Sequence, residues 1–288
     1  MIDEKAVWDD IWPVVERLIS ATVAEDTPTI RPLLYPNSQA ADALDIFGFP
    51  AFDILLKTVL GHNRLGLTRA IEGDDGRAVF IEFAWLDPKS GSGYTGVDMV
   101  TVRLDAVRPA ADWLVTEINP TNADLPLNGP HATSILAGTQ ALSEDGKLPS
   151  EPWVLPVAFI AGSLQLPLTP GAAADPVEKL LLPGLQARMF GPFSQIYARR
   201  LWRDFVATGG EIDPAERTGA WAAAVEVIIG EQSGRKETQA TVGRHYRVSL
   251  GGVANRVNHI RRALGIDGLD ARYSELISTE IVYKESDK

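Results

Sequence analysis

Residues 219–264 read GAWAAAVEVIIGEQSGRKETQATVGRHYRVSLGGVANRVNHIRRAL, and the rest of the chain is interpreted around this stretch. Its apolar side chains recur at helical spacing, which predicts three helices joined by tight turns. The buried face of the first helix is marked by Trp221, Val225, Ile228 and Ile229. Residues 220–264 are therefore expected to form a compact helical module.

The second and third predicted helices carry recognisable start signals. Thr238 is expected to cap the second helix, Gln239 to Tyr246, and Ser249 the third. Between them Arg247, Val248 and Ser249 form a predicted tight turn. At 100° per residue, the third helix places its apolar residues in one narrow sector, at Val253, Val257, Ile260 and Leu264. The opposite side carries Gly251, Asn255, Asn258, His259 and Arg262.

The charge of the chain is distributed unevenly. Residues 235–262 contain seven Arg or Lys and one acid, Glu237, which makes the segment +6. The whole chain has a net charge of −11, so the residues outside this segment have a net charge of −17. This acidic balance argues against a protein that covers nucleic acid or membrane surfaces non-specifically. Asn, His and Arg side chains donate to base edges and phosphates. The predicted DNA contacts are Arg244, Arg247, Asn255, Arg256, Asn258, His259, Arg261 and Arg262.

The run ETQATVGRHYRVSLGGVANRVNHIRRALG, residues 237–265, resembles the helix-turn-helix of many bacterial regulators. Together with the preceding WAAAVEVII it is also similar to the cyclin-type repeat of transcription factor IIB. The resemblance implies contact with double-stranded DNA. The sequence departs from the pattern at Gly251 and Gly252, where each glycine costs a helix about 1 kcal/mol relative to Ala. Either the backbone approaches phosphate closely there, or the module binds protein instead.

In the first part of the chain, the spacing of apolar residues changes from that of a helix to that of a strand. Residues 4–24 and about 40–60 predict helices, and residues 64–72, 77–86, 97–107 and 112–118 predict strands. This order predicts an α+β domain at 1–120, with helices packed on a curved antiparallel sheet. The loop-rich residues 121–152 are a predicted linker or crossover, and 153–288 a predicted all-α domain that contains the helix-turn-helix.

Residues 5–120 resemble, in the order and length of their elements, the cone-shaped nuclear transport factor 2-like fold shared with the ketosteroid isomerase and polyketide cyclase families. The resemblance implies an apolar pocket between helices and sheet, suited to a small apolar ligand. The residues predicted to line it are Asp53, His62, Trp85, Asp98, Trp113 and Glu117.

Several classes of chemistry have no signal in the sequence. The chain has no Cys, and its four His show no metal-ligand spacing, so no metal or cofactor is expected. No Gly-rich phosphate loop or nucleophile elbow is present, and no catalytic residue is assigned. The acidic start lacks a signal peptide, and the uncharged residues 152–174 contain prolines at 156, 167 and 170. These features predict a cytoplasmic protein without membrane contact.

Three hypotheses follow. The favoured one is a transcriptional regulator in which the first domain senses a ligand or dimerises and the helix-turn-helix contacts DNA, with a homodimer expected. The second is a non-enzymatic protein-interaction module. The third is an isomerase or cyclase, which requires a carboxylate pair such as Asp98 and Glu117 facing one pocket.

Overall fold

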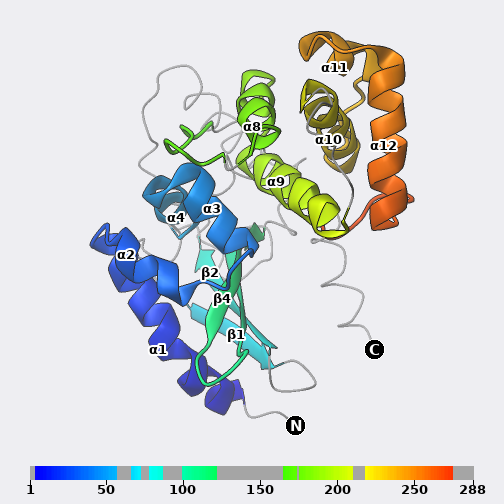
Figure 1. Ribbon diagram of the computed structural model, residues 1–288. Helices are drawn as coiled ribbons and strands as arrows, with labels where there is room; N and C mark the ends of the chain where they lie inside the picture. Colours follow the sequence, from blue (N-terminus) through cyan, green and yellow to red (C-terminus); the bar gives the residue numbers. More distant parts are fainter. Residues whose placement is uncertain are drawn as a thin grey trace. The chain divides into compact units, whose positions relative to one another are not determined.

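The computed structural model describes the backbone of residues 4–56, 66–72, 78–86, 99–121, 165–173, 175–209 and 218–274. Side chains are described for residues 9–56, 104–118, 165–173, 175–209 and 218–274. The chain divides into two compact units, Met1–Thr169 and Pro170–Lys288, which are described separately below (Figure 1). Residues 122–152 of the predicted linker lie outside the described residues, and the predicted domain boundaries stay predictions.

The first unit begins with one long helix and several shorter ones. They are α1 Glu4–Val23, α2 Thr27–Ile30, the 3₁₀ helix η1 Arg31–Leu33, α3 Gln39–Phe47 and α4 Phe49–Leu55. The single helix expected at about 40–60 is wrong, because the chain breaks at Gly48. That residue has a positive φ of 70°, which ends α3, and α4 then begins at Phe49 with Pro50 in its first turn.

Four antiparallel strands follow in sequential order. They are β1 Gly66–Glu72, β2 Ala78–Leu86, β3 Met99–Val107 and β4 Leu114–Thr121. Each lies within three residues of its predicted bounds, so the antiparallel meander is confirmed. Helices followed by this sheet give the first unit a mixed α+β fold, with α1 against β1 and α3 against β4.

One buried side chain joins helix and sheet. Gln39, the first residue of α3, donates through Nε2 to the carbonyl of Ile118, 3.2 Å away. Its Oε1 accepts from the Ile118 amide at 3.1 Å. A bulge beside Asp105 and Ala106 shifts the register of β3 and β4, which explains why Val115 and Ile118 are both buried despite their odd spacing.

The described part of the second unit contains helices and no strand. They are α8 Glu178–Ala187, α9 Pro192–Ala207, α10 Thr218–Gln232, α11 Gln239–His245 and α12 Leu250–Leu264. Helix α8 ends at Ala187 and α9 begins at Pro192, because Met189 has a φ of 58° and Gly191 precedes the proline.

Helix α10 is the centre of this unit and contacts the other four helices (Figure 1). Most of its residues are buried, including Trp221. The Trp221 ring centroid lies 5.9 Å from that of Trp202 and 5.1 Å from that of Phe205, both of α9. Such aromatic clusters stabilise a core beyond the area they bury.

Candidate nucleic-acid interface

Helices α11 and α12 are joined by a tight turn whose caps match the sequence prediction. Thr238 accepts the amide of Thr241 at 3.2 Å and caps α11. Ser249 accepts the amide of Gly252, also at 3.2 Å, and caps α12. Arg247 lies in the turn with a φ of 56°. Both predicted N-caps are therefore confirmed.

Gly243 allows this turn to close. Its carbonyl accepts the Val248 amide at 2.8 Å. A Cβ at Gly243 would lie 3.1 Å from the Val248 carbonyl oxygen and 3.3 Å from a Val253 methyl. The absence of a side chain thus lets α11 approach both the turn and α12.

The two sides of α12 differ in chemistry, as predicted. Val253, Val257 and Ile260 are buried against the unit. Asn255, Asn258 and Arg262 are exposed, and 3.6 residues per turn places them in one sector about 60° wide. Among the described residues, none of these three side chains makes an intramolecular hydrogen bond or ion pair.

Three of the predicted contact residues are held within the unit. Arg256 lies over the Trp221 ring, 5.1 Å from its centroid, and donates to the Gly252 carbonyl at 3.2 Å. Arg261 forms an ion pair with Glu231 of α10. His259 is exposed, yet its ring meets Phe205 edge-on at 5.2 Å between centroids. These residues therefore also fasten α12 to the core.

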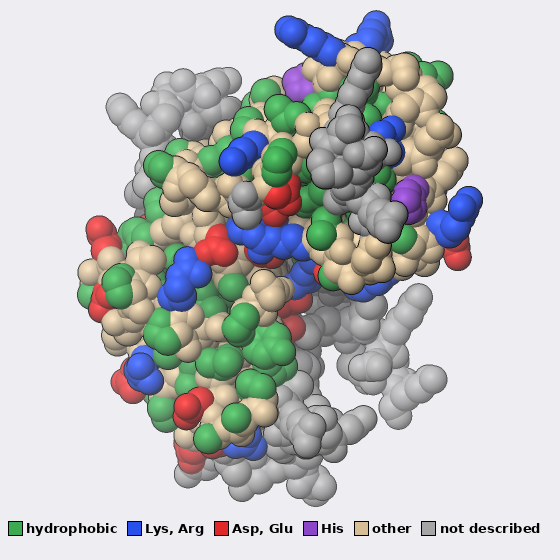
Figure 2. Space-filling model, in the orientation of Figure 1, with side chains coloured by type: hydrophobic (Ala, Val, Ile, Leu, Met, Phe, Trp, Pro, Cys, Tyr) green, Lys and Arg blue, Asp and Glu red, His purple; other side chains and the backbone are tan. Residues whose placement is uncertain are grey.

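Arg244 and Arg247 are exposed on α11 and the turn. Arg244 donates to the Thr241 hydroxyl at 3.4 Å. From Thr238 to Leu264 the sequence holds five Arg and no Asp or Glu. Figure 2 shows Lys and Arg side chains projecting outward around α11 and α12. The surface formed by Arg244, Arg247, Asn255, Asn258 and Arg262 is called the α12 face below.

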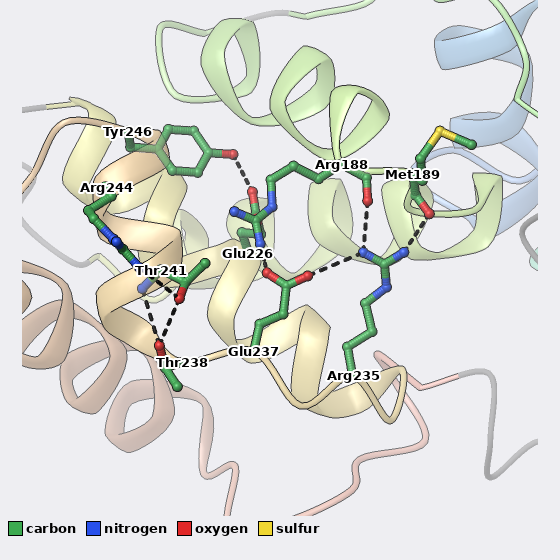
Figure 3. Close-up of polar contacts among 9 residues, drawn as sticks. All are labelled: Arg188, Met189, Glu226, Arg235, Glu237, Thr238, Thr241, Arg244 and Tyr246. Carbon is green, nitrogen blue, oxygen red and sulfur yellow. Dashed lines mark hydrogen bonds and ion pairs between the residues drawn. The ribbon is translucent and has the colours of Figure 1, made fainter.

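A polar network centred on the buried Glu226 side chain joins α10 to the residues that follow α8 and α11 (Figure 3). The Glu226 side chain is 0% exposed, and its Oε1 lies 2.7 Å from Nε of Arg188. Tyr246, which follows α11, donates its hydroxyl to Glu226 Oε2 at 2.7 Å. Arg188 also pairs with Glu237, whose other oxygen faces Arg235 at 3.7 Å.

Arg235 completes this network by donating to the carbonyls of Arg188 and Met189, at 2.9 and 2.6 Å. Gly184 leaves room for Tyr246, since a Cβ there would fall against the Tyr246 hydroxyl. The sequence prediction missed this network, because Glu226 lies in a largely apolar stretch of α10 and its partners, Arg188 and Tyr246, are distant from it in the sequence.

Burial has the largest effect on the pKa values of Glu226 and Tyr246. It raises the pKa of Glu226 above the ordinary value of 4.5, and the Tyr246 hydrogen bond and Arg188 oppose that rise. Burial and the neighbouring Glu226 carboxylate raise the pKa of Tyr246 as well. Tyr246 therefore stays a hydroxyl donor throughout the physiological range.

Glu226→Gln is expected to remove one contribution to the pH dependence of the free energy of unfolding. The folded state binds the Glu226 proton more tightly than the unfolded state, so the free energy of unfolding falls as pH rises from about 4.5 through the raised pKa. Urea unfolding of wild type and variant should show the wild-type value falling relative to the variant over this window. A difference that is constant, or that rises with pH, would contradict the expectation.

Gly251→Ala is expected to raise the free energy of unfolding by up to about 1 kcal/mol. Gly251 is exposed and helical, and a Cβ there would meet no atom within 4 Å. The matched control is Gly243→Ala, expected to cost about 1–3 kcal/mol because its Cβ meets Val248 and Val253. Urea unfolding followed by circular dichroism measures both, and a destabilised Gly251→Ala variant would be the contrary result.

The ligand-pocket residues predicted in the first unit are only partly described. Trp113 is 5% exposed, and its indole donates to Asp10 of α1 at 2.8 Å. Arg108 covers the Trp113 ring and pairs with Asp10 at 2.7 Å. Trp113 thus holds α1 against the turn between β3 and β4.

Of the remaining pocket residues, Asp53 is half-buried on α4. Glu117 is half-buried opposite Asp105, and the neighbouring pair Leu104 and Ile118 points into the core. His62, Asp98 and the Trp85 side chain lie outside the described residues. The pocket and the carboxylate pair stay predictions.

The described residues contain no group of three or more His, Asp or Glu that could hold a metal ion. In the same part of the chain, no helix combines the length and apolar character needed to cross a membrane. Comparisons with protein-family models, with curated proteins and with solved structures gave no match to this chain.

Proposed function

We propose that the chain is a transcriptional regulator that contacts double-stranded DNA through the α12 face. The observation that carries this proposal is the surface around α11 and α12, where three exposed arginines and two exposed asparagines stand in a segment without any acid. In a chain of net charge −11, such a surface concentrates attraction for a polyanion at one place.

The geometry supports a helix laid in the major groove. A major groove about 12 Å wide admits an α-helix, and the tight turn and two caps hold α12 at a fixed angle to α11. Arg244 and Arg247, before α12, and Arg262, in its last turn, are exposed and would contact phosphates beside the groove. The first unit would sense a small apolar ligand or mediate dimerisation.

The proposal is tested by fluorescence anisotropy of a labelled mixed-sequence duplex titrated with the full chain at about 50 mM and 200 mM salt. Neutralising three phosphates predicts a slope of log K against log salt of about −2.7, hence an affinity loss of about 40-fold between these salts. An absence of binding at both salts would refute DNA contact.

A protein-interaction module is the second candidate function, favoured by one observation. Leu250, the first residue of α12, is 55% exposed beside Gly251, so an apolar side chain stands next to the α12 face. A protein partner bound at this place would bury Leu250, so Leu250→Lys would weaken its binding. Unchanged binding would mean that the contact lies elsewhere. Failure of the duplex titration would make this candidate the favoured one.

A further inference from the structure

We infer that the α12 face reads adenine bases in the major groove through Asn255 and Asn258. This inference rests on the proposed DNA contact and assigns the base that the contact would recognise. The two amides stand three residues apart, which is about 4.5 Å along the helix axis. Both are exposed near the middle of α12, and neither is engaged by another described side chain.

The chemistry of the side-chain amide selects adenine. An Asn side chain offers one acceptor oxygen and one NH₂ donor. Adenine presents the complementary pair in the major groove, with N7 as acceptor and the N6 amino group as donor. Guanine presents two acceptors, N7 and O6, so an Asn amide satisfies only one of them well, whereas Arg satisfies both.

The arginines of α12 leave the middle of this face to the asparagines. Arg256 lies over Trp221, and Arg261 pairs with Glu231. Arg262 is exposed but belongs to the last turn of the helix, where it is suited to a phosphate. The exposed polar side chains at the centre of α12 are therefore the two amides and His259, whose ring packs against Phe205, and no guanidinium lies free between the amides.

The size of the effect follows from the contacts. Each well-formed bidentate pair discriminates against the wrong base by at least about fivefold, so two pairs predict a preference of at least about 25-fold for adenine-containing sites. Asn255 and Asn258 carry no charge, so their replacement should leave binding to other sequences unchanged. Loss of a base contact therefore removes the preference for adenine alone, whereas loss of a phosphate contact weakens binding to every sequence.

The experiment compares three duplexes of equal length at one salt concentration, titrated with the full chain. One contains mixed A·T pairs, one contains G·C pairs, and one replaces every adenine by 7-deazaadenine, which lacks the N7 acceptor. The wild type should prefer the A·T duplex by at least about 25-fold, and 7-deazaadenine should remove most of that preference. The double variant Asn255→Ala/Asn258→Ala should bind all three as the wild type binds G·C.

Two controls keep the outcomes separate. Asn255→Gln/Asn258→Gln retains the amide and should keep part of the preference, and circular dichroism should show unchanged unfolding because both residues are exposed. Equal wild-type affinity for A·T and G·C, or a preference that survives in the Ala variant, would overturn adenine reading while leaving DNA contact intact. No binding to any duplex would overturn the proposed function itself.

Discussion

The double variant Arg244→Glu/Arg262→Glu is expected to bind duplex DNA about 100-fold more weakly than the wild type at about 0.1 M salt. Each arginine that leaves a phosphate forfeits the release of a counterion, and each glutamate adds repulsion. The slope of log K against log salt should become shallower by about 1.8, or 0.9 per lost contact. Anisotropy titrations over several salt concentrations measure both quantities.

Arg244 and Arg262 are chosen because both are exposed and neither holds the fold together. Arg256 is unsuited to the test, since its guanidinium lies over Trp221 and its replacement would disturb the core. The matched control is Arg17→Glu/Lys179→Glu, which makes the same change in net charge at exposed positions on α1 and α8. Equal weakening in both variants would assign the effect to total charge, and unchanged binding in the first would remove the α12 face from the contact.

Trp221→Ala is expected to lower the free energy of unfolding of the second unit by about 3–5 kcal/mol. The side chain is 2% exposed and is surrounded by Trp202, Phe205, His259 and Arg256. Its removal leaves a cavity under α12 and takes away the ring on which Arg256 rests. Because small domains have a total stability of about 5–15 kcal/mol, this loss is a large fraction of it.

Urea unfolding followed by far-UV circular dichroism measures this change. Val206→Ala is the control, because Val206 is an exposed apolar residue of the neighbouring helix α9, and its truncation should change stability by less than about 0.5 kcal/mol. A Trp221→Ala variant that unfolds at the wild-type urea concentration would contradict the central place of Trp221 in the core.

The features that the sequence predicted well depend on local signals. Thr238 and Ser249 cap their helices because their hydroxyls reach amides three residues ahead, which is a property of the local chain. The four strands were located by alternation, and the buried residues of α12 by helical spacing.

The features that the sequence left out depend on residues distant in the chain. Arg256 and Arg261 belong to the basic cluster by composition, but Trp221 and Glu231 of α10 engage them. Glu226 meets Tyr246 only once α10 and α11 have packed together. The break at Gly48 was missed because the apolar pattern continues across it, whereas its φ of 70° ends the helix.

Hydrogen exchange of the full chain, with and without a saturating duplex, tests the central claim most directly. If the α12 face contacts DNA, exchange should slow in peptides from residues 238–264, foremost around the turn at Arg247 to Ser249. Peptides from Met1–Thr169 should exchange at the same rate in both samples. Protection confined to Met1–Thr169, or a bound duplex that leaves residues 238–264 unprotected, would contradict the account.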